Sequence, residues 1–170
     1  MKVELVAAEA SDRERLENLL ELYIHDMSEI LGSTPGEDGR FGYRGLDGYW
    51  SDPGRHPFLV RADGRLAGFV LVSRGSQVSG DAAVLDVTEF FVVRGLRRSG
   101  VGRAAALSVF SSFDGTWEVR VMQRNTGALR FWEETVRSFA GQAFETEAWR
   151  SPRGTDMRVW RFRSPSAKAR

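Results

Sequence analysis

Cysteine is absent from the 170 residues, which excludes disulfides, thiol chemistry and thiolate metal sites. Only two histidines occur, His25 and His56, and they lie far apart in the sequence, so a histidine-rich metal site is not expected. No run approaches the roughly eighteen apolar residues of a membrane-spanning helix, and the first residues, MKVELVAAEASDRE, lack the apolar core of a signal peptide. We therefore expect no metal, no membrane association and a cytoplasmic location.

Charge of one sign is also lacking, since the formal net charge is only +1. This balance gives no overall field that would attract nucleic acid. A group of arginines near the end of the chain is the exception: Arg150, Arg153, Arg158, Arg161 and Arg163. Arginines on the solvent face of strands explain this group better than a binding patch does. A nucleic-acid binder that uses these strands remains an alternative, and it predicts a strongly salt-dependent affinity.

The composition is that of an ordinary globular protein, with 42% hydrophobic and 28% charged residues. The length suits one compact core and is short for two. We predict a single domain over residues 1–163, followed by a disordered, small and polar tail over residues 164–170.

The first part of the chain predicts a short strand at residues 3–7 and then a long helix. Ser11 and Glu14 have the spacing of a capping box, and apolar side chains recur behind them at helical spacing as far as Gly32. Residues 32–48 hold six glycines and one proline, too many for a regular element. Because this segment also carries aromatic side chains, we expect it to be packed down or to line a site.

Strands and helices continue to alternate through the rest of the chain. Strands are predicted at residues 57–62, 66–73, 83–93, 117–122, 142–149 and 155–163, and helices at residues 101–113 and around 128–139. Asp63-Gly64 marks a tight hairpin turn. This pattern predicts one α/β domain.

The most informative segment is residues 85–106, LDVTEFFVVRGLRRSGVGRAAA, in which a strand leads into a glycine turn that opens a helix. Such a turn presents unpaired backbone N–H groups at the positive end of a helix dipole, which suits a pyrophosphate. Gly100 and Gly102 have no side chain, so phosphates can approach the backbone. Three arginines nearby, Arg97, Arg98 and Arg103, can add charge-assisted contacts.

Two other phosphate-binding turns fit this segment poorly. A P-loop needs a lysine after its second glycine, and no lysine occurs between Lys2 and Lys168. A dinucleotide fingerprint follows the first strand of a βαβ unit. Here the glycine pair, Gly100 and Gly102, follows the fourth predicted strand, without that context.

The segment resembles the acyl-CoA-binding motif of the GNAT superfamily, R/Q-x-x-G-x-G/A, matched by Arg97, Gly100 and Gly102. The resemblance covers almost the whole chain, because the element order and a later segment also match. That later segment is Asn125, Ala128, Phe131 and Trp132. The resemblance implies a mixed α/β (α+β) fold with a mostly antiparallel central sheet of about seven strands, split near strands 4 and 5 and flanked by about four helices.

The resemblance also implies a function, an N-acetyltransferase that moves an acetyl group from acetyl-CoA to a primary amine by direct attack. The amine would belong to a small molecule, a protein or a peptide. A backbone N–H near Phe90 would polarise the thioester carbonyl. The residues that the resemblance assigns to the cofactor are Phe90, Phe91, Val92, Arg97, Arg98, Ser99, Gly100, Val101, Gly102, Arg103, Asn125, Phe131 and Trp132.

The attacking amine must lose a proton, and Glu89 and Asp86 are the candidate general bases. They have opposite parity on one strand, so only one faces the cleft unless a bulge intervenes. We prefer Glu89. For either residue, a solvent-facing acid paired with an arginine is an equal alternative.

Trp132 departs from the family, in which a tyrosine at this position often protonates the departing thiolate. An indole N–H is not a useful acid, so this role is empty or falls to water or to a tyrosine from the N-terminal region. The departure also keeps open a second interpretation, a catalytically weak or inactive acyl-CoA-binding sensor or interaction module.

The acceptor is expected to bind after the first long helix, where the candidate residues are Tyr23, Tyr43, Tyr49 and Trp50. An acidic and aromatic lining would suit a cationic amine, although a satellite core under a long loop is the simpler interpretation for each aromatic. The identity of the amine, the acyl chain and the oligomeric state, with a homodimer as one option, stay open.

Overall fold

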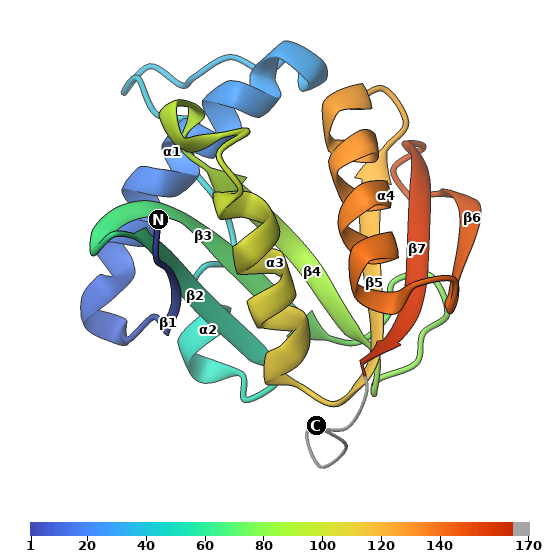
Figure 1. The fold of residues 1–170 in the computed structure, drawn as a ribbon. Coiled ribbons are helices and arrows are strands. Elements are labelled where there is room, and N and C mark those ends of the chain that lie inside the picture. Colours follow the sequence, from blue (N-terminus) through green and yellow to red (C-terminus); the bar gives the residue numbers. More distant parts are fainter. Residues whose placement is uncertain (165–170) are drawn as a thin grey trace. The chain divides into compact units, whose positions relative to one another are not determined.

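The computed structural model describes residues 1–164, and their elements follow the predicted order (Figure 1). The strands are β1 (Val3–Ala7), β2 (Arg55–Ala62), β3 (Arg65–Arg74), β4 (Leu85–Val92), β5 (Gly115–Met122), β6 (Phe144–Arg150) and β7 (Asp156–Ser164). The helices are α1 (Arg13–Leu31), α2 (Gly48–Ser51), α3 (Val101–Ser112) and α4 (Thr126–Ala140), with short 3-10 helices at Ala10–Asp12 and Arg94–Leu96. The single turn α2 is the fourth of the expected helices.

The strands form a seven-stranded sheet in the order β1-β2-β3-β4-β5-β7-β6. β4 and β5 are parallel, with Leu85 opposite Trp117. The pairs β1–β2, β5–β7 and β6–β7 are antiparallel. The predicted mixed, mostly antiparallel sheet is therefore confirmed.

The contacts divide the chain into two compact units. The first unit comprises residues 1–71 and 89–102, and the second comprises residues 72–88 and those from 103 onward. β3 and β4 contribute residues to both units. The single domain over residues 1–163 stays a prediction.

The first unit has a core between α1 and its strands. Leu16 and Leu20 of α1 are fully buried in one apolar cluster with Leu59 of β2 and Phe69 of β3. Burying such a side chain contributes about 1.5–3 kcal/mol. The leucines that recur at helical spacing therefore mark the face of α1 that packs on the sheet.

The start of α1 differs from the prediction. Ser11 and Glu14 do not form a capping box, because the chain first makes a 3-10 turn in which Ser11 itself lies. The carboxylate of Asp12 instead accepts a hydrogen bond from the backbone N–H of Glu9 at 3.1 Å. The N-terminal cap is thus formed by Glu9 and Asp12, a pair that lies two residues earlier in the chain than Ser11 and Glu14.

The glycine-rich segment after α1 is irregular, as predicted, and it is tied down. Gly32 ends the helix with a left-handed φ of 67°, a conformation that favours glycine. The carboxylate of Glu21, within α1, accepts hydrogen bonds from the backbone N–H groups of Phe41 at 2.7 Å and Gly42 at 2.9 Å. The expectation of a packed-down loop is therefore confirmed.

Two glycines of the first unit have clear structural reasons. Asp63 and Gly64, between β2 and β3, have φ values of 48° and 75°, as a type I′ hairpin turn requires. At Gly68 of β3, an added Cβ would lie 2.0 Å from the carbonyl oxygen of Phe91 in β4. Only glycine lets these two backbones approach so closely.

The second unit packs α3 and α4 over its strands around an aromatic core. The ring of Phe110 in α3 lies 5.2 Å from Trp117, 6.1 Å from Trp132 and 4.8 Å from Phe162. Figure 1 shows α4, in orange, beside β5 and β7, and contacts join it to both strands. Trp132 is only 5% exposed, so it belongs to this core.

The chain end is partly described. β7 extends to Ser164, whose hydroxyl donates a hydrogen bond to the carbonyl oxygen of Phe110 at 2.8 Å. The rest of the predicted tail, residues 165–170, lies outside the described residues. Within the part of the chain that is described, no helix combines the length and apolar character needed to cross a membrane.

Candidate active site

The turn between β4 and α3 has the backbone shape of an anion-binding site. Arg98 and Gly100 adopt left-handed φ values of 59° and 90°. Among residues 1–164, no protein acceptor takes a hydrogen bond from the backbone N–H of Arg98, Ser99 or Gly100, and the first N–H groups of a helix have no partner within it. No heavy atom lies within 4 Å of the position that a Cβ on Gly100 would take. The turn thus offers bare amides and free space.

Arg97, the first residue of the motif, uses its side chain as a brace. Its Nε donates to the carbonyl oxygen of Val92 at 2.8 Å, and its guanidinium lies 5.6 Å from the centre of the Phe91 ring. The same guanidinium forms an ion pair with Asp26 of α1, and Arg94 Nε donates to the other oxygen of Asp26 at 2.8 Å. The Arg97 guanidinium is therefore engaged by protein groups.

The remaining residues of the turn divide into structural and exposed ones. Ser99 donates its hydroxyl hydrogen to the carbonyl oxygen of Leu96 at 2.6 Å, and Val101 is 1% exposed. Arg103 bonds to the hydroxyl of Ser138 in α4, within the second unit. Arg98 is exposed.

The residues of α4 that were assigned to the cofactor also have structural contacts. Asn125 caps the helix, because its Oδ1 accepts the backbone N–H of Ala128 at 3.1 Å. The rings of Phe131 and Trp132 lie 4.9 Å apart. A role for Asn125, Phe131 and Trp132 in cofactor binding stays a prediction.

The carboxylate of Glu89 accepts hydrogen bonds from two tyrosine hydroxyls. Tyr23 Oη donates to Glu89 Oε2 at 2.6 Å, and Tyr43 Oη donates to Oε1 at 3.2 Å. The Tyr23 ring also packs edge-on against Phe69 and Phe91, at 5.9 and 6.1 Å. Burial, followed by the negative charge of Glu89, raises the pKa of Tyr23 and of Tyr43. Both phenols therefore stay protonated and act as hydrogen-bond donors.

Asp86 has a different environment from Glu89. It is 1% exposed, and both of its oxygens accept hydrogen bonds from Arg120, at 2.5 and 3.2 Å. Burial raises the pKa of Asp86, while Arg120 acts in the opposite direction. Asp86 is therefore paired with an arginine, as the alternative expected, but it is buried and does not face solvent. Glu89 is partly exposed and bonded to tyrosines.

The predicted acceptor residues lie in or against the core of the first unit. Tyr49 is 4% exposed, and Trp50 donates its indole N–H to the carbonyl oxygen of Ala8 at 3.2 Å. Tyr23 and Tyr43 pack against the same cluster and direct their hydroxyls to Glu89. Tyr49 and Trp50 thus have the packing of a satellite core. Acceptor binding by the four aromatics stays a prediction.

The sequence analysis did not predict the ion pairs that Asp26 makes with Arg94 and Arg97. Asp26 lies three residues after Tyr23, so both side chains project from one face of α1. This face carries the contact to Glu89 and the contact to Arg97. The spacing was a usable signal, but the partners, 66 and 71 residues away, had no local signal.

A family model described as the acetyltransferase (GNAT) family matches residues 16–136 of the chain. The chain belongs to the GNAT acetyltransferase family. The matched range contains the turn at residues 97–102 and Glu89. No curated protein sequence matches the chain significantly.

Solved structures of other GNAT proteins share the fold. An acetyltransferase from Thermus thermophilus has a TM-score of 0.69 at 17% identity, covering 96% of this chain and 97% of that one. The spermidine N-acetyltransferase of Vibrio cholerae, in complex with CoA and spermine, has a TM-score of 0.65 at 15% identity and 95% coverage of both chains. The ribosomal-protein-S18-alanine N-acetyltransferase of Escherichia coli has a TM-score of 0.63 at 12% identity, covering 98% and 96%.

Proposed function

We propose that this GNAT protein transfers an acetyl group from acetyl-CoA to a primary amine of a small molecule, protein or peptide. The observation that carries the proposal is the turn, whose N–H groups at residues 98–100 meet no acceptor among residues 1–164. The family match supports an acetyltransferase. CoA in the Vibrio cholerae structure, and the amine substrates named for two relatives, support the donor and the acceptor class.

The turn fits a pyrophosphate by charge and by space. Its bare amides and the start of α3 point partial positive charge at one region, and the space at Gly100 is open. We assign the added guanidinium contact to Arg98, which is exposed. Arg97 is assigned a different task, since its guanidinium holds the turn to α1 and to the end of β4.

Glu89 is proposed as the general base. The amine loses a proton to the Glu89 carboxylate, directly or through one water, and its nitrogen attacks the thioester carbonyl carbon. The C–S bond then breaks and the thiolate leaves. Tyr23 and Tyr43 orient the carboxylate through these two hydrogen bonds. Asp86 is less suited, because Arg120 engages both of its oxygens.

No general acid is assigned to the departing thiolate. Trp132 is buried in the aromatic core, and the raised pKa values of Tyr23 and Tyr43 make both phenols poor proton donors. A thiolate is a good leaving group, so we propose that water supplies its proton. The acyl-CoA-binding module without catalysis remains the competing function, and turnover separates the two.

Steady-state release of CoA with a panel of amines is the direct test. A thiol-reactive dye measures the released CoA, and the protein adds no signal of its own, since it has no cysteine. Glu89→Gln should lower kcat by about 10²–10⁴-fold with little change in acetyl-CoA affinity. Glu29→Gln, at another acidic position of the same unit, is the control and should behave as wild type. Equal kcat for Glu89→Gln across the pH range would remove Glu89 from the mechanism, and no release with any amine would favour the binding module.

Acetyl-CoA binding by calorimetry tests the turn separately. Gly100→Trp should abolish it. Gly39→Trp is a matched control, because Gly39 has a similar left-handed φ of 75° and equally open surroundings but lies in the loop after α1. Both variants place a side chain at a left-handed φ, 90° at Gly100 and 75° at Gly39, so backbone strain is similar and only the turn variant should lose the ligand. Unchanged affinity in Gly100→Trp would refute the assignment of the turn.

A further inference from the structure

A cavity lies wholly within the second unit, between α4 and the β6–β7 hairpin. Its volume is about 540 Å³, within the range of small-molecule sites. The polar side chains that bear on the argument are Thr126, Arg130, Glu133, Arg137, Thr146 and Arg158. Phe144 and Trp160 add apolar surface.

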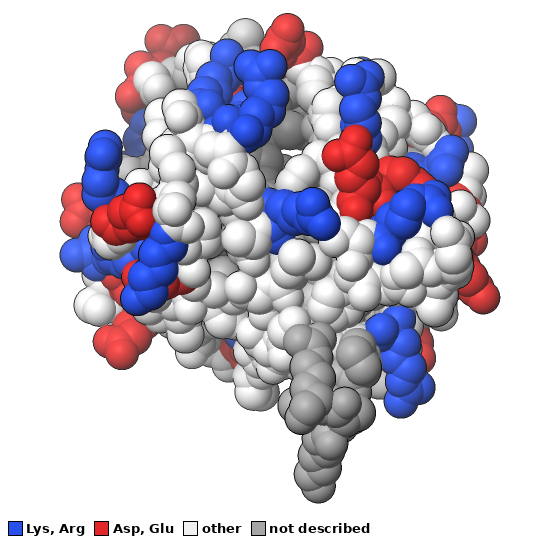
Figure 2. Space-filling view, in the orientation of Figure 1, with Lys and Arg blue, Asp and Glu red and all other residues white. Residues whose placement is uncertain are grey.

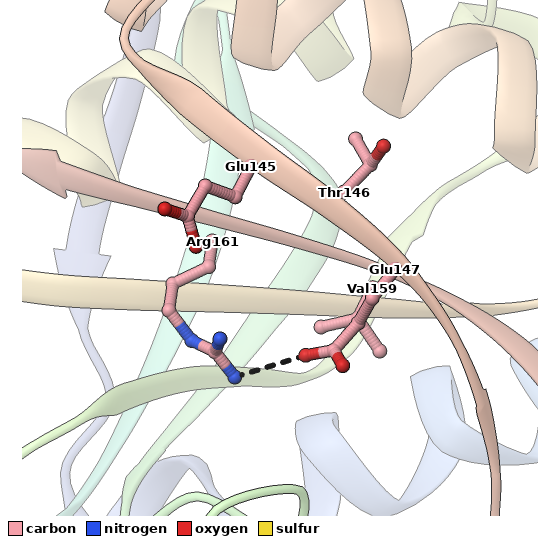
Figure 3. Close-up of a pocket in the computed structure, with 5 residues that line it drawn as sticks. All are labelled: Glu145, Thr146, Glu147, Val159 and Arg161. Atoms are coloured by element: carbon pink, nitrogen blue, oxygen red, sulfur yellow. Dashed lines mark hydrogen bonds and ion pairs between the residues drawn. The ribbon is translucent and has the colours of Figure 1, made fainter.

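The acids of β6 do not face this cavity. In Figure 3, Glu145 and Glu147 project from one side of the hairpin, where Glu147 pairs with Arg161 at 3.2 Å, and Thr146 points to the other side. This alternation follows from strand geometry. The face toward α4 therefore receives a hydroxyl from β6 and no carboxylate.

The cavity has an excess of positive charge. Among the described lining residues the one carboxylate is Glu133, which accepts the Trp160 indole N–H at 2.7 Å and an Arg137 N–H at 2.5 Å. These two hydrogen bonds lower the pKa of Glu133, so it is ionised at neutral pH and offsets one guanidinium. Within residues 1–164, Arg130 and Arg158 enter no ion pair. The described lining thus carries three guanidinium groups against one carboxylate.

Arg158 shows how the excess of positive charge is placed in the cavity. Its side chain is half-buried on β7, opposite Ala148 of β6, and Glu133, whose charge it feels, is already hydrogen-bonded to Trp160 and Arg137. Thr126, the first residue of the fifteen-residue helix α4, lines the same cavity, so the positive end of the helix dipole lies beside it. On the face shown in Figure 2, basic and acidic side chains are interspersed.

We infer that this cavity binds a small anion that carries at least two negative charges on carboxylate or phosphate oxygens. Arg130 and Arg158 provide the charge-assisted hydrogen bonds. The hydroxyls of Thr126 and Thr146 donate to remaining oxygens, and Phe144 packs against the carbon body of the ligand. The site does not depend on acetyl transfer, because none of these residues belongs to the turn or to the Glu89 cluster.

Calorimetric titration with citrate and with inorganic phosphate, at constant ionic strength, tests the inference. Both titrations are made on the Gly100→Trp protein as well as on wild type with excess CoA, so that the turn does not contribute. Saturable binding is expected to at least one anion. Arg158→Gln and Arg130→Gln should each weaken it by about tenfold or more, the effect of losing a hydrogen bond to a charged group.

Arg153→Gln is the control, since Arg153 is an exposed arginine in the loop between β6 and β7 and does not line the cavity. It should bind as wild type does. Arg130 is exposed on a helix, so its variant keeps the test valid should Arg158→Gln unfold. Equal affinity in Arg130→Gln and wild type, or an equal loss in Arg153→Gln, would overturn the site. The absence of saturable binding for both anions would do the same.

Discussion

The hydroxyl of Tyr23 lies 2.6 Å from a carboxylate oxygen of Glu89, although the two residues are 66 positions apart in the chain. Tyr23→Phe removes this hydrogen bond and leaves the ring packing. We expect kcat to fall while the KM for acetyl-CoA is kept, because the carboxylate loses its orientation. The free energy of unfolding should fall by about 1 kcal/mol.

Tyr43→Phe is the comparison, since its longer bond of 3.2 Å to Glu89 should contribute less. Kinetics and denaturant unfolding on both variants provide the measurement. A drop in stability without any change in kcat for Tyr23→Phe would leave Tyr23 as a packing residue only.

Asp26 should control cofactor affinity from outside the turn. Asp26→Asn weakens the ion pairs to Arg97 and Arg94, so the turn is less well organised before the ligand arrives and binding must order it. We expect the Kd for CoA to rise by about 3–10-fold with kcat at saturation unchanged, a change of roughly 1 kcal/mol. Stability should change by about 1 kcal/mol at most, because both arginines are substantially exposed.

Calorimetry with CoA measures this effect, and Glu29→Gln on the same helix is its control. Wild-type CoA affinity in Asp26→Asn would show that Asp26 does not organise the turn for binding.

Gly68→Ala tests the close approach of β3 and β4. The new Cβ would meet the carbonyl oxygen of Phe91 at 2.0 Å, and this obstacle is backbone that cannot rotate away. We expect a loss of about 1–3 kcal/mol of stability, measured by urea unfolding. Gly127→Ala offers a comparison, since its Cβ would meet nothing within 4 Å. A Gly68→Ala protein as stable as wild type would show that β3 and β4 can move apart at this point without a loss of stability.

Glu133 should titrate at an unusually low pH. The Trp160 indole N–H and then Arg137 lower its pKa below the ordinary 4.5. A carboxyl with a depressed folded pKa adds stability above its unfolded pKa, and this stability is lost as the pH falls through the folded value. Carboxyl NMR should show the low pKa in wild type and a return toward 4.5 in Trp160→Phe. An identical titration in the two proteins would contradict the assigned cause.

Much of the fold could be predicted because its signals are local. The apolar spacing of α1, the hairpin residues Asp63 and Gly64, and the stop at Gly32 each act over a few neighbouring residues. The start of α1 was wrong for a related reason. Two overlapping pairs, Ser11 with Glu14 and Glu9 with Asp12, have cap-like spacing, and the 3-10 turn that selects between them depends on how the preceding strand enters.

The site was predictable to the same extent. The turn is contiguous, so its glycines and its place between a strand and a helix made it a candidate site. The environment of Glu89 was not, because Tyr23 and Tyr43 reach it from distant segments. The task of Arg97 was missed for the same reason, since its partner Asp26 lies 71 residues away.

The hydrogen bonds between Glu21 and the segment after α1 should slow the opening of that segment. A chain rich in glycine has many conformations to lose, and here one carboxylate fixes two successive peptide groups. The amides of Phe41 and Gly42 should therefore exchange with deuterium more slowly than their neighbours. Neutralising Glu21 should release the segment that carries Tyr43, so that both amides exchange faster and the hydrogen bond of Tyr43 to Glu89 is less well held.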